Sequence, residues 1–147
     1  MESSTPSRDT AWAMSQENVE IVRRMYAALT RGDGDSVREL AVPEFVVDFS
    51  RRLVEPGVLR GRDEALASLG QFRETWDDWP VWEPQELIDA DDKVVALIRA
   101  SARGKESGIE VDAYVWDLWT FHDGKLVELK YFGDDRAAAL EAAGLSE

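Results

Sequence analysis

The sequence contains no cysteine and a single histidine, His122. The lack of cysteine excludes disulfides, thiol catalysis and cysteine-ligated metals. One histidine excludes a metal site of several imidazoles, and no clustered carboxylates indicate a hard-cation site, so we expect neither a metal nor an organic cofactor. No run approaches the roughly 20 apolar residues of a membrane span, and residues 1–14 lack an apolar signal region. We therefore expect a cytoplasmic protein.

Basic residues are also scarce, with 17 Lys and Arg against 30 Asp and Glu, for a net charge of −13. A surface this acidic repels phosphate backbones and anionic lipid, which disfavours nucleic-acid and membrane-surface roles. The 147 residues, 44% of them hydrophobic, are enough for one domain with its own core. We place this domain at residues 15–147, after a disordered tail over residues 1–14 that is rich in Ser, Thr and Pro.

Periodicity and breaker residues predict four helices. The first begins with Ser15 as its N-cap, carries an apolar stripe through Met25 and Tyr26, and ends at Arg31-Gly32. A short second helix runs from about residue 35 to before Pro43, and a third from about residue 62 to Pro80. The third has one apolar face, formed by Leu66, Leu69, Phe72 and Trp76. A last short helix, capped by Asp134 or Asp135, ends at Gly144.

Strands are predicted near residues 45–49, 82–90, 93–103, 109–122 and 125–132, with a loop over residues 51–61. Asp123-Gly124 is typical of a two-residue hairpin turn between the last two strands. Helices therefore dominate the first half of the chain and strands the second. This order predicts an α+β fold with an antiparallel sheet, not a parallel doubly wound one.

Two predicted strands carry large apolar side chains on both faces. In strand 109–122 one face holds Tyr114, Trp116, Leu118 and Thr120, and the other Val115, Asp117, Trp119 and Phe121. In strand 93–103, Val94, Ala96, Ile98 and Ala100 lie opposite Val95, Leu97, Arg99 and Ser101. Such a sheet is covered on both faces. Helices can cover one face, and a second subunit is the simplest cover for the outer one, so we predict a homodimer.

Three of the strands place a charged group on a face suited to burial: Asp48, Asp117 and Arg99. Burying an unpaired carboxylate costs roughly several kcal/mol, so each acid must be paired, protonated or exposed in a cavity. An acid in an apolar site has a raised pKa and can donate a proton, or abstract one beside a carbonyl. Arg99, if it points inward, pairs with one of these acids or receives an anionic group of a ligand.

Four segments resemble the SnoaL-like family of the nuclear-transport-factor-2-like superfamily: NVEIVRRMYAALTRGD, LRGRDEAL, WTFHDGKLVELKYF and DDRAAALEAAGL. The resemblance covers about residues 15–144. It implies a cone-shaped, curved sheet of five to six strands, mixed in direction. Three helices from the N-terminal half close the cone, a short C-terminal helix follows, and a pocket for a small, largely apolar molecule lies inside.

Within that superfamily the ketosteroid isomerases offer the sharpest comparison. Their general base ends the first strand after helix two, where AVPEFVVDF places Asp48, and their protonated oxyanion-hole acid matches Asp117 in WDLWTF. Counting back from Gly32-Asp33 puts Met25 at the position of their helix-one tyrosine, with Tyr26 about 100° further around the helix. The expected pocket residues are Met25, Tyr26, Leu97, Arg99, Val115, Trp119, Leu129 and Tyr131.

The leading hypothesis is acid–base chemistry, of the isomerase or cyclase type, on a small carbonyl compound. The alternative is a non-catalytic binding or dimerisation module in which the acids only satisfy Arg99. Epoxide hydrolases of this superfamily use an Asp-Arg-Asp set, and Ser101 stands where the second acid would follow Arg99. The acid that SnoaL-like cyclases carry after the last strand would be Asp134 or Asp135, although both are better explained as helix caps.

Overall fold

The computed structural model describes residues 8–53, 55–75 and 80–146, so Trp76 and Trp79 lie outside the described residues. The helices are α1 (Arg8–Arg31), α2 (Gly34–Leu40), α3 (Arg62–Thr75) and α4 (Arg136–Ala142). The strands are β1 (Ala41–Asp48), β2 (Val58–Arg60), β3 (Val81–Ala90), β4 (Lys93–Arg103), β5 (Glu110–His122) and β6 (Lys125–Gly133). None of the described helices is long and apolar enough to cross a membrane.

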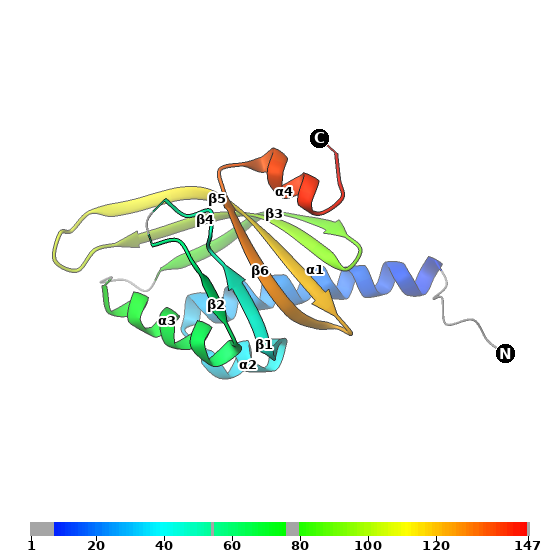
Figure 1. Cartoon of the computed structure of the whole chain (residues 1–147), viewed down its shortest axis with the longest axis horizontal. Coiled ribbons are helices and arrows are strands. Elements are labelled where there is room, and N and C mark those ends of the chain that lie inside the picture. Colours follow the sequence, from blue (N-terminus) through cyan, green and yellow to red (C-terminus); the bar gives the residue numbers. More distant parts are fainter. Residues whose placement is uncertain (1–7, 54, 76–79, 147) are drawn as a thin grey trace.

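The strands form one mixed sheet in the order β2-β1-β6-β5-β4-β3 (Figure 1). The four strands β3 to β6 pair antiparallel, as their turn residues predict. β1 pairs parallel with β6, and the three-residue β2 pairs with β1 inside the segment that we expected to be a loop. The α+β fold with a curved mixed sheet is therefore confirmed, while β2 was missed because three residues carry too little periodicity.

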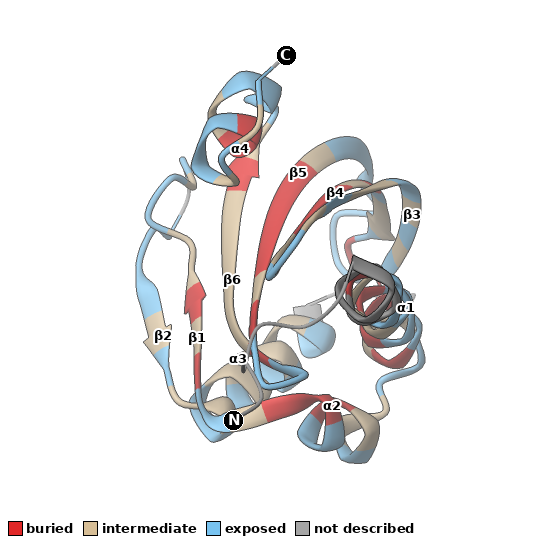
Figure 2. Ribbon diagram, turned by 90° about the vertical axis from the view of Figure 1, so that its right-hand side faces the viewer, coloured by how far each residue is buried: buried red, intermediate tan, exposed pale blue. Residues whose placement is uncertain are grey.

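The sheet curves around α1, with α2 and α3 completing the closure and α4 on the outer face (Figure 2). Thr30 fixes the end of α1 to the edge strand, because its hydroxyl accepts a hydrogen bond from the Trp82 backbone N–H at 3.0 Å. Arg62, at the start of α3, donates to the carbonyl oxygens of Arg38 and Ala41 at 2.9 and 3.1 Å. The helices are thereby held against the concave face.

Apolar residues alternate between two clusters, one on each face of the sheet. In β4, Val94 and Ala96 belong to the concave cluster and Val95 to the outer one. Leu140 of α4 packs on the outer cluster, so the C-terminal helix supplies cover that we had expected from a second subunit. Beyond α4 the outer face stays open, with Tyr114 57% exposed. The homodimer remains a prediction.

Two boundaries differ from expectation. α1 begins at Arg8, and Ser15, expected as its cap, is buried within the helix. β1 begins at Ala41, although the second helix was expected to continue to just before Pro43 and the strand to begin at residue 45. The pairing of β1 with β6 is irregular between Ala41 and Val46. A proline has no N–H to donate to a ladder, so an irregular stretch tolerates it.

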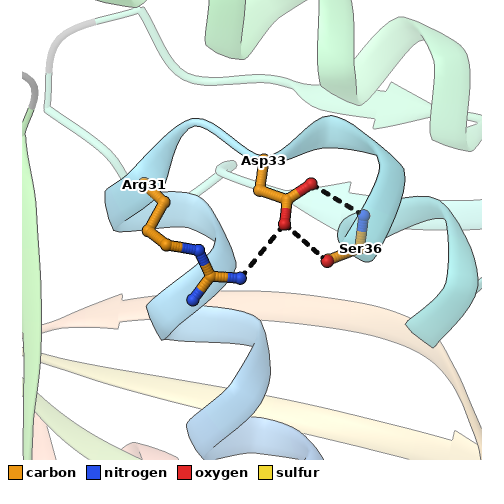
Figure 3. Close-up of polar contacts among 3 residues, drawn as sticks. All are labelled: Arg31, Asp33 and Ser36. Carbon is orange, nitrogen blue, oxygen red and sulfur yellow. Dashed lines mark hydrogen bonds and ion pairs between the residues drawn. The ribbon is translucent and has the colours of Figure 1, made fainter.

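Asp33 is the N-cap of α2 (Figure 3). Its carboxylate accepts hydrogen bonds from the Ser36 hydroxyl at 2.6 Å, the Ser36 backbone N–H at 3.1 Å and Arg31 at 3.1 Å. These hydrogen bonds lower the pKa of Asp33 to about 2. The Asp33 carboxylate therefore stays ionised at pH values well above 2.

Replacing this cap should destabilise the junction between α1 and α2. Asp33→Ala removes every acceptor and should lower the thermal unfolding midpoint by about 3 °C, measured by circular dichroism. Asp33→Asn keeps a good capping oxygen without the charge, so its midpoint should lie between those of the wild type and the alanine variant. Equal midpoints for all three proteins would show that this cap contributes nothing to stability.

Candidate functional site

Asp117 is a buried carboxylate on β5, flanked on its own face by Trp119 and exposed by only 7%. The hydroxyl of Tyr26, reaching across from α1, donates to Asp117 Oδ2 at 2.6 Å. The indole Nε1 of Trp119 donates in turn to the Tyr26 oxygen at 2.7 Å. Helix and sheet are therefore joined by a directed chain of hydrogen bonds that ends on the carboxylate.

The surroundings of Asp117 raise its pKa. Burial raises the pKa to about 6, although the hydrogen bond from Tyr26 acts in the opposite direction. No cation of the described residues lies within ion-pair distance of this carboxylate. Burial and the neighbouring Asp117 charge raise the pKa of Tyr26 well above its ordinary value. Near neutral pH the carboxyl group is therefore the member of the pair that exchanges a proton.

Asp117 lies where enclosed residues of β5 and β6 give way to half-buried ones on the concave face, although Ile98, beside Val115 on β4, is fully enclosed. On β5, Phe121 and Trp119 are almost fully enclosed, whereas Val115, beyond Asp117, is half-buried. On β6, Leu126 is enclosed and Tyr131 half-buried. The second oxygen of Asp117, Oδ1, has no hydrogen-bond partner among the described residues and is not sealed from solvent. Oδ1 therefore keeps an unused acceptor position.

The half-buried part of the concave face beyond Asp117, which we call the open end, is bordered by aromatic side chains and one cationic side chain. Tyr131 lies directly opposite Asp117 in the pairing of β5 with β6. The ring of Phe49, just after β1, meets the Tyr131 ring edge-on, with centroids 6.0 Å apart. The guanidinium of Arg52 stacks over Phe49, 4.2 Å from the ring centroid. The open end therefore offers an apolar surface beside a hydroxyl and a cation.

The structure does not bring Asp48 together with Asp117. Asp48 pairs with Lys130 across β1 and β6, and Lys130 pairs with Leu118 of the outer cluster. The Asp48 carboxylate accepts a hydrogen bond from the Ser50 backbone N–H at 2.9 Å and lies 4.0 Å from Lys130 Nζ. The bond from Ser50 is the main cause of its lowered pKa. Asp48 therefore faces away from the concave side, and its expected role as the base loses its geometric support.

Arg99 and Leu97 also lie on the outer face. Arg99 forms a two-pronged ion pair with Asp112 at 2.8 and 2.9 Å, which holds the pKa of Asp112 below its ordinary value. Leu97 packs against the outer cluster. The prediction was that an inward-pointing Arg99 would pair with Asp117 or Asp48, or would receive an anionic group of a ligand. Arg99 instead points outward and contacts Asp112, two residues along β5 from Tyr114, its partner in the strand pairing. Arg99 therefore neutralises neither candidate acid.

The other predicted pocket residues share the concave side with Asp117: Met25, Tyr26, Val115, Trp119, Leu129 and Tyr131. Met25 is packed in the core, and Tyr26 is the residue that reaches the carboxylate. Sequence reasoning missed Phe49, although it ends the predicted strand 45–49 in step with Phe45 and Val47, and it missed Arg52, which lies in the segment expected to be a loop. The described residues contain no group of three or more His, Asp or Glu side chains suited to a metal ion.

A family model for the SnoaL-like domain matches residues 22–129. The chain therefore belongs to the SnoaL-like family, within the nuclear-transport-factor-2-like superfamily. It is 27% identical over 122 residues to the uncharacterized protein Rv0034 of Mycobacterium tuberculosis. This alignment covers 82% of this chain and 92% of the relative.

Two solved structures show the same fold. Bal32a, from a soil-derived mobile gene cassette, superposes with a TM-score of 0.75 at 23% identity, covering 83% of this chain and 92% of its own. A putative SnoaL-like polyketide cyclase from Jannaschia sp. CCS1 has a TM-score of 0.70 at 23% identity, covering 90% and 92%. At this level of identity the likeness establishes the architecture, and function has to be argued from the site.

Proposed function

We propose that the protein binds a small, largely apolar carbonyl compound at the open end and that Asp117 moves a proton to and from the carbon beside the carbonyl. One observation carries the proposal. Asp117 is buried among apolar residues with no described cation beside it, and it lies next to the half-buried residues of the open end. A buried carboxylate whose hydrogen-bond partners are all neutral lowers the stability of the folded protein. Carboxylates of this kind are enriched at functional sites.

The proton transfer follows from the two oxygens of Asp117. Oδ2 is held by Tyr26, which leaves Oδ1 to take the proton. The electron pair of the broken C–H bond forms the C=C bond of an enolate, and the negative charge moves to the carbonyl oxygen. Tyr131, opposite Asp117 in the strand pairing, would donate a hydrogen bond to that oxygen. Asp117 then returns the proton to another carbon of a conjugated enolate, which completes an isomerisation, or it exchanges the proton with water before returning it to the same carbon, which completes an exchange.

A pKa of about 6 suits this task. A base is most useful when its pKa lies close to the working pH, because it is then both ionised and basic enough. Tyr26 contributes by position: it orients the carboxylate and does not itself titrate near neutrality. This assignment gives Asp117 the role of the base that the sequence had suggested for Asp48.

The test begins with a thermal-shift screen of cyclic ketones of steroid and polyketide type. Hits are then followed by NMR for deuterium uptake from D₂O at the carbon beside the carbonyl. Asp117→Asn should slow this uptake by about 100-fold or more. In the wild type, the rate should rise with pH up to about 6 and level off above it, because the ionised form is the active one.

Asp48→Asn is the matched control, since it removes one carboxylate from the opposite face and should leave the exchange rate unchanged. If Asp48→Asn abolished exchange while Asp117→Asn did not, the assignment would be reversed. Binding without exchange in any protein would favour the second candidate function, a non-catalytic ligand-binding module. That candidate is favoured by the Trp119–Tyr26–Asp117 chain, which satisfies part of the carboxylate without any substrate.

A further inference from the structure

Two consecutive arginines after β1 lie in different surroundings. Arg51 donates to Asp135 at 2.9 Å and lies 5.0 Å from the ring centroid of Phe132, in the outer cluster. Arg52 instead stacks over Phe49 at the open end. Arg51 therefore has a carboxylate partner, whereas no described carboxylate lies within 4.0 Å of the Arg52 guanidinium.

The lack of a partner for Arg52 stands out in a chain with 30 acidic residues. A guanidinium stacked on an aromatic ring presents its face to the ring and keeps its edge of N–H donors free. That edge matches the two oxygens of a carboxylate, or of an acidic enol, in a bidentate arrangement. Arg52 is half-buried, so such a contact would be only partly screened by water.

Charges of both signs act on Tyr131 at the open end. Burial raises the pKa of Tyr131, the charge of Asp117 adds to that shift, and the charge of Arg52 opposes it. Arg52 is thus close enough to act on the open end electrostatically. Asp117 lies at the inner end of the site and Asp134, which also acts on Tyr131, is exposed. The inner end therefore carries the Asp117 carboxyl group, and the Arg52 cation and the Asp134 carboxylate both act on Tyr131 at the other end.

We propose that Arg52 is a specificity-determining residue that binds an oxyanion carried by the ligand, a carboxylate or an acidic enol. The ligand is then amphipathic: its apolar body lies against Phe49 and Tyr131, and its uncharged reacting end reaches Asp117. This inference rests on the proposed function, because it assumes that the ligand occupies the open end. It adds a substrate class, apolar acids in place of neutral ketones alone.

The test compares two probes of nearly equal shape, 2-naphthoate and the uncharged 2-naphthamide, titrated into the full chain at about pH 7.5, well above the pKa of the probe acid. The wild type should bind naphthoate about tenfold more tightly, the effect of one charge-assisted contact. Arg52→Gln should remove that preference and leave naphthamide binding within about twofold. Arg51→Gln removes the same charge near the outer cluster and should keep the preference.

Arg52→Lys keeps the charge and should retain part of the preference, which guards against a glutamine variant that fails to fold. If the wild type bound both probes equally, or if Arg52→Gln kept the preference for naphthoate, the role of Arg52 would be overturned while the apolar site stood. If neither probe bound to the wild type or to any variant, the proposed binding site itself would be overturned together with this inference.

Discussion

Asp117→Asn should make the protein more stable than the wild type at neutral pH, and this gain should shrink in acid. The pKa of Asp117 is about 6 in the folded protein and 3.8 is its ordinary value, which the unfolded chain should show. A difference of about two pKa units corresponds to about 3 kcal/mol of stability that the wild type loses as pH rises through this window.

The sign follows from which state holds the proton more tightly. Below about pH 4 the carboxyl group is protonated in both states, so its raised pKa has no cost. Between about pH 4 and 6 the unfolded chain loses the proton first, which favours unfolding. Above about pH 6 both states are ionised and the full penalty of the buried charge applies. Asparagine keeps the shape without the charge and should lack this dependence.

Urea denaturation of both proteins at several pH values from about 4 to 7.5 measures the effect. The useful quantity is the difference between the two free energies of unfolding. Asp33, Asp48 and Asp112 have lowered pKa values, so their contributions are lost as pH falls; these residues are present in both proteins and cancel. A difference that stays constant with pH would show that Asp117 titrates normally.

Tyr26→Phe should be the second variant with a large change in stability, here a loss, because the hydroxyl that it removes forms hydrogen bonds with two buried groups. Asp117 Oδ2 loses its donor, and the indole N–H of Trp119 loses its acceptor. Leaving a buried polar group unsatisfied costs about 1–3 kcal/mol, so the loss of stability at neutral pH should be about 3 kcal/mol. The pKa of Asp117 should also rise, since the hydrogen bond from Tyr26 lowers it.

The two effects give separate measurements. Chemical denaturation reports the stability, and NMR titration of the Asp117 carboxyl carbon reports the pKa. Tyr114→Phe is the matched control, because the side chain of Tyr114 is exposed and its hydroxyl should matter little. An unchanged pKa in Tyr26→Phe would mean that the hydroxyl does not donate to the carboxylate in solution, and Tyr26 would lose its positioning role.

Local patterns predicted most of the fold. The Asp123-Gly124 turn and the alternation in residues 93–103 and 109–122 identify antiparallel partners, since a two-residue turn sets the register of its hairpin. The same alternation places Asp117 beside Trp119 on one face, and the core confirms that this face is buried. The parallel contact of β1 with β6 was not foreseen as a specific pairing, because no local turn joins these strands.

The site was only partly predictable for the same reason. Alternation correctly groups Asp48 with Val46, but FVVDF is apolar on both faces and cannot say which face turns toward the core. The position of Tyr26 depended on the rotation of α1, and counting along the helix pointed to its neighbour Met25. Arg99 was expected to line the pocket, yet the register of β4 with β5 places it beside Asp112 on the outer face.

The sequence by itself determined the class of fold, the family, and which acid lies among apolar residues on its strand. All three follow from patterns between residues that are close together in the sequence. Only the tertiary structure decided that Tyr26 reaches Asp117, that Asp48 faces outward and that Arg52 lies beside Phe49 and Tyr131 at the open end. These depend on how distant segments are placed against one another. A shift of one residue in register, or of about 100° in helix rotation, reverses where a side chain points.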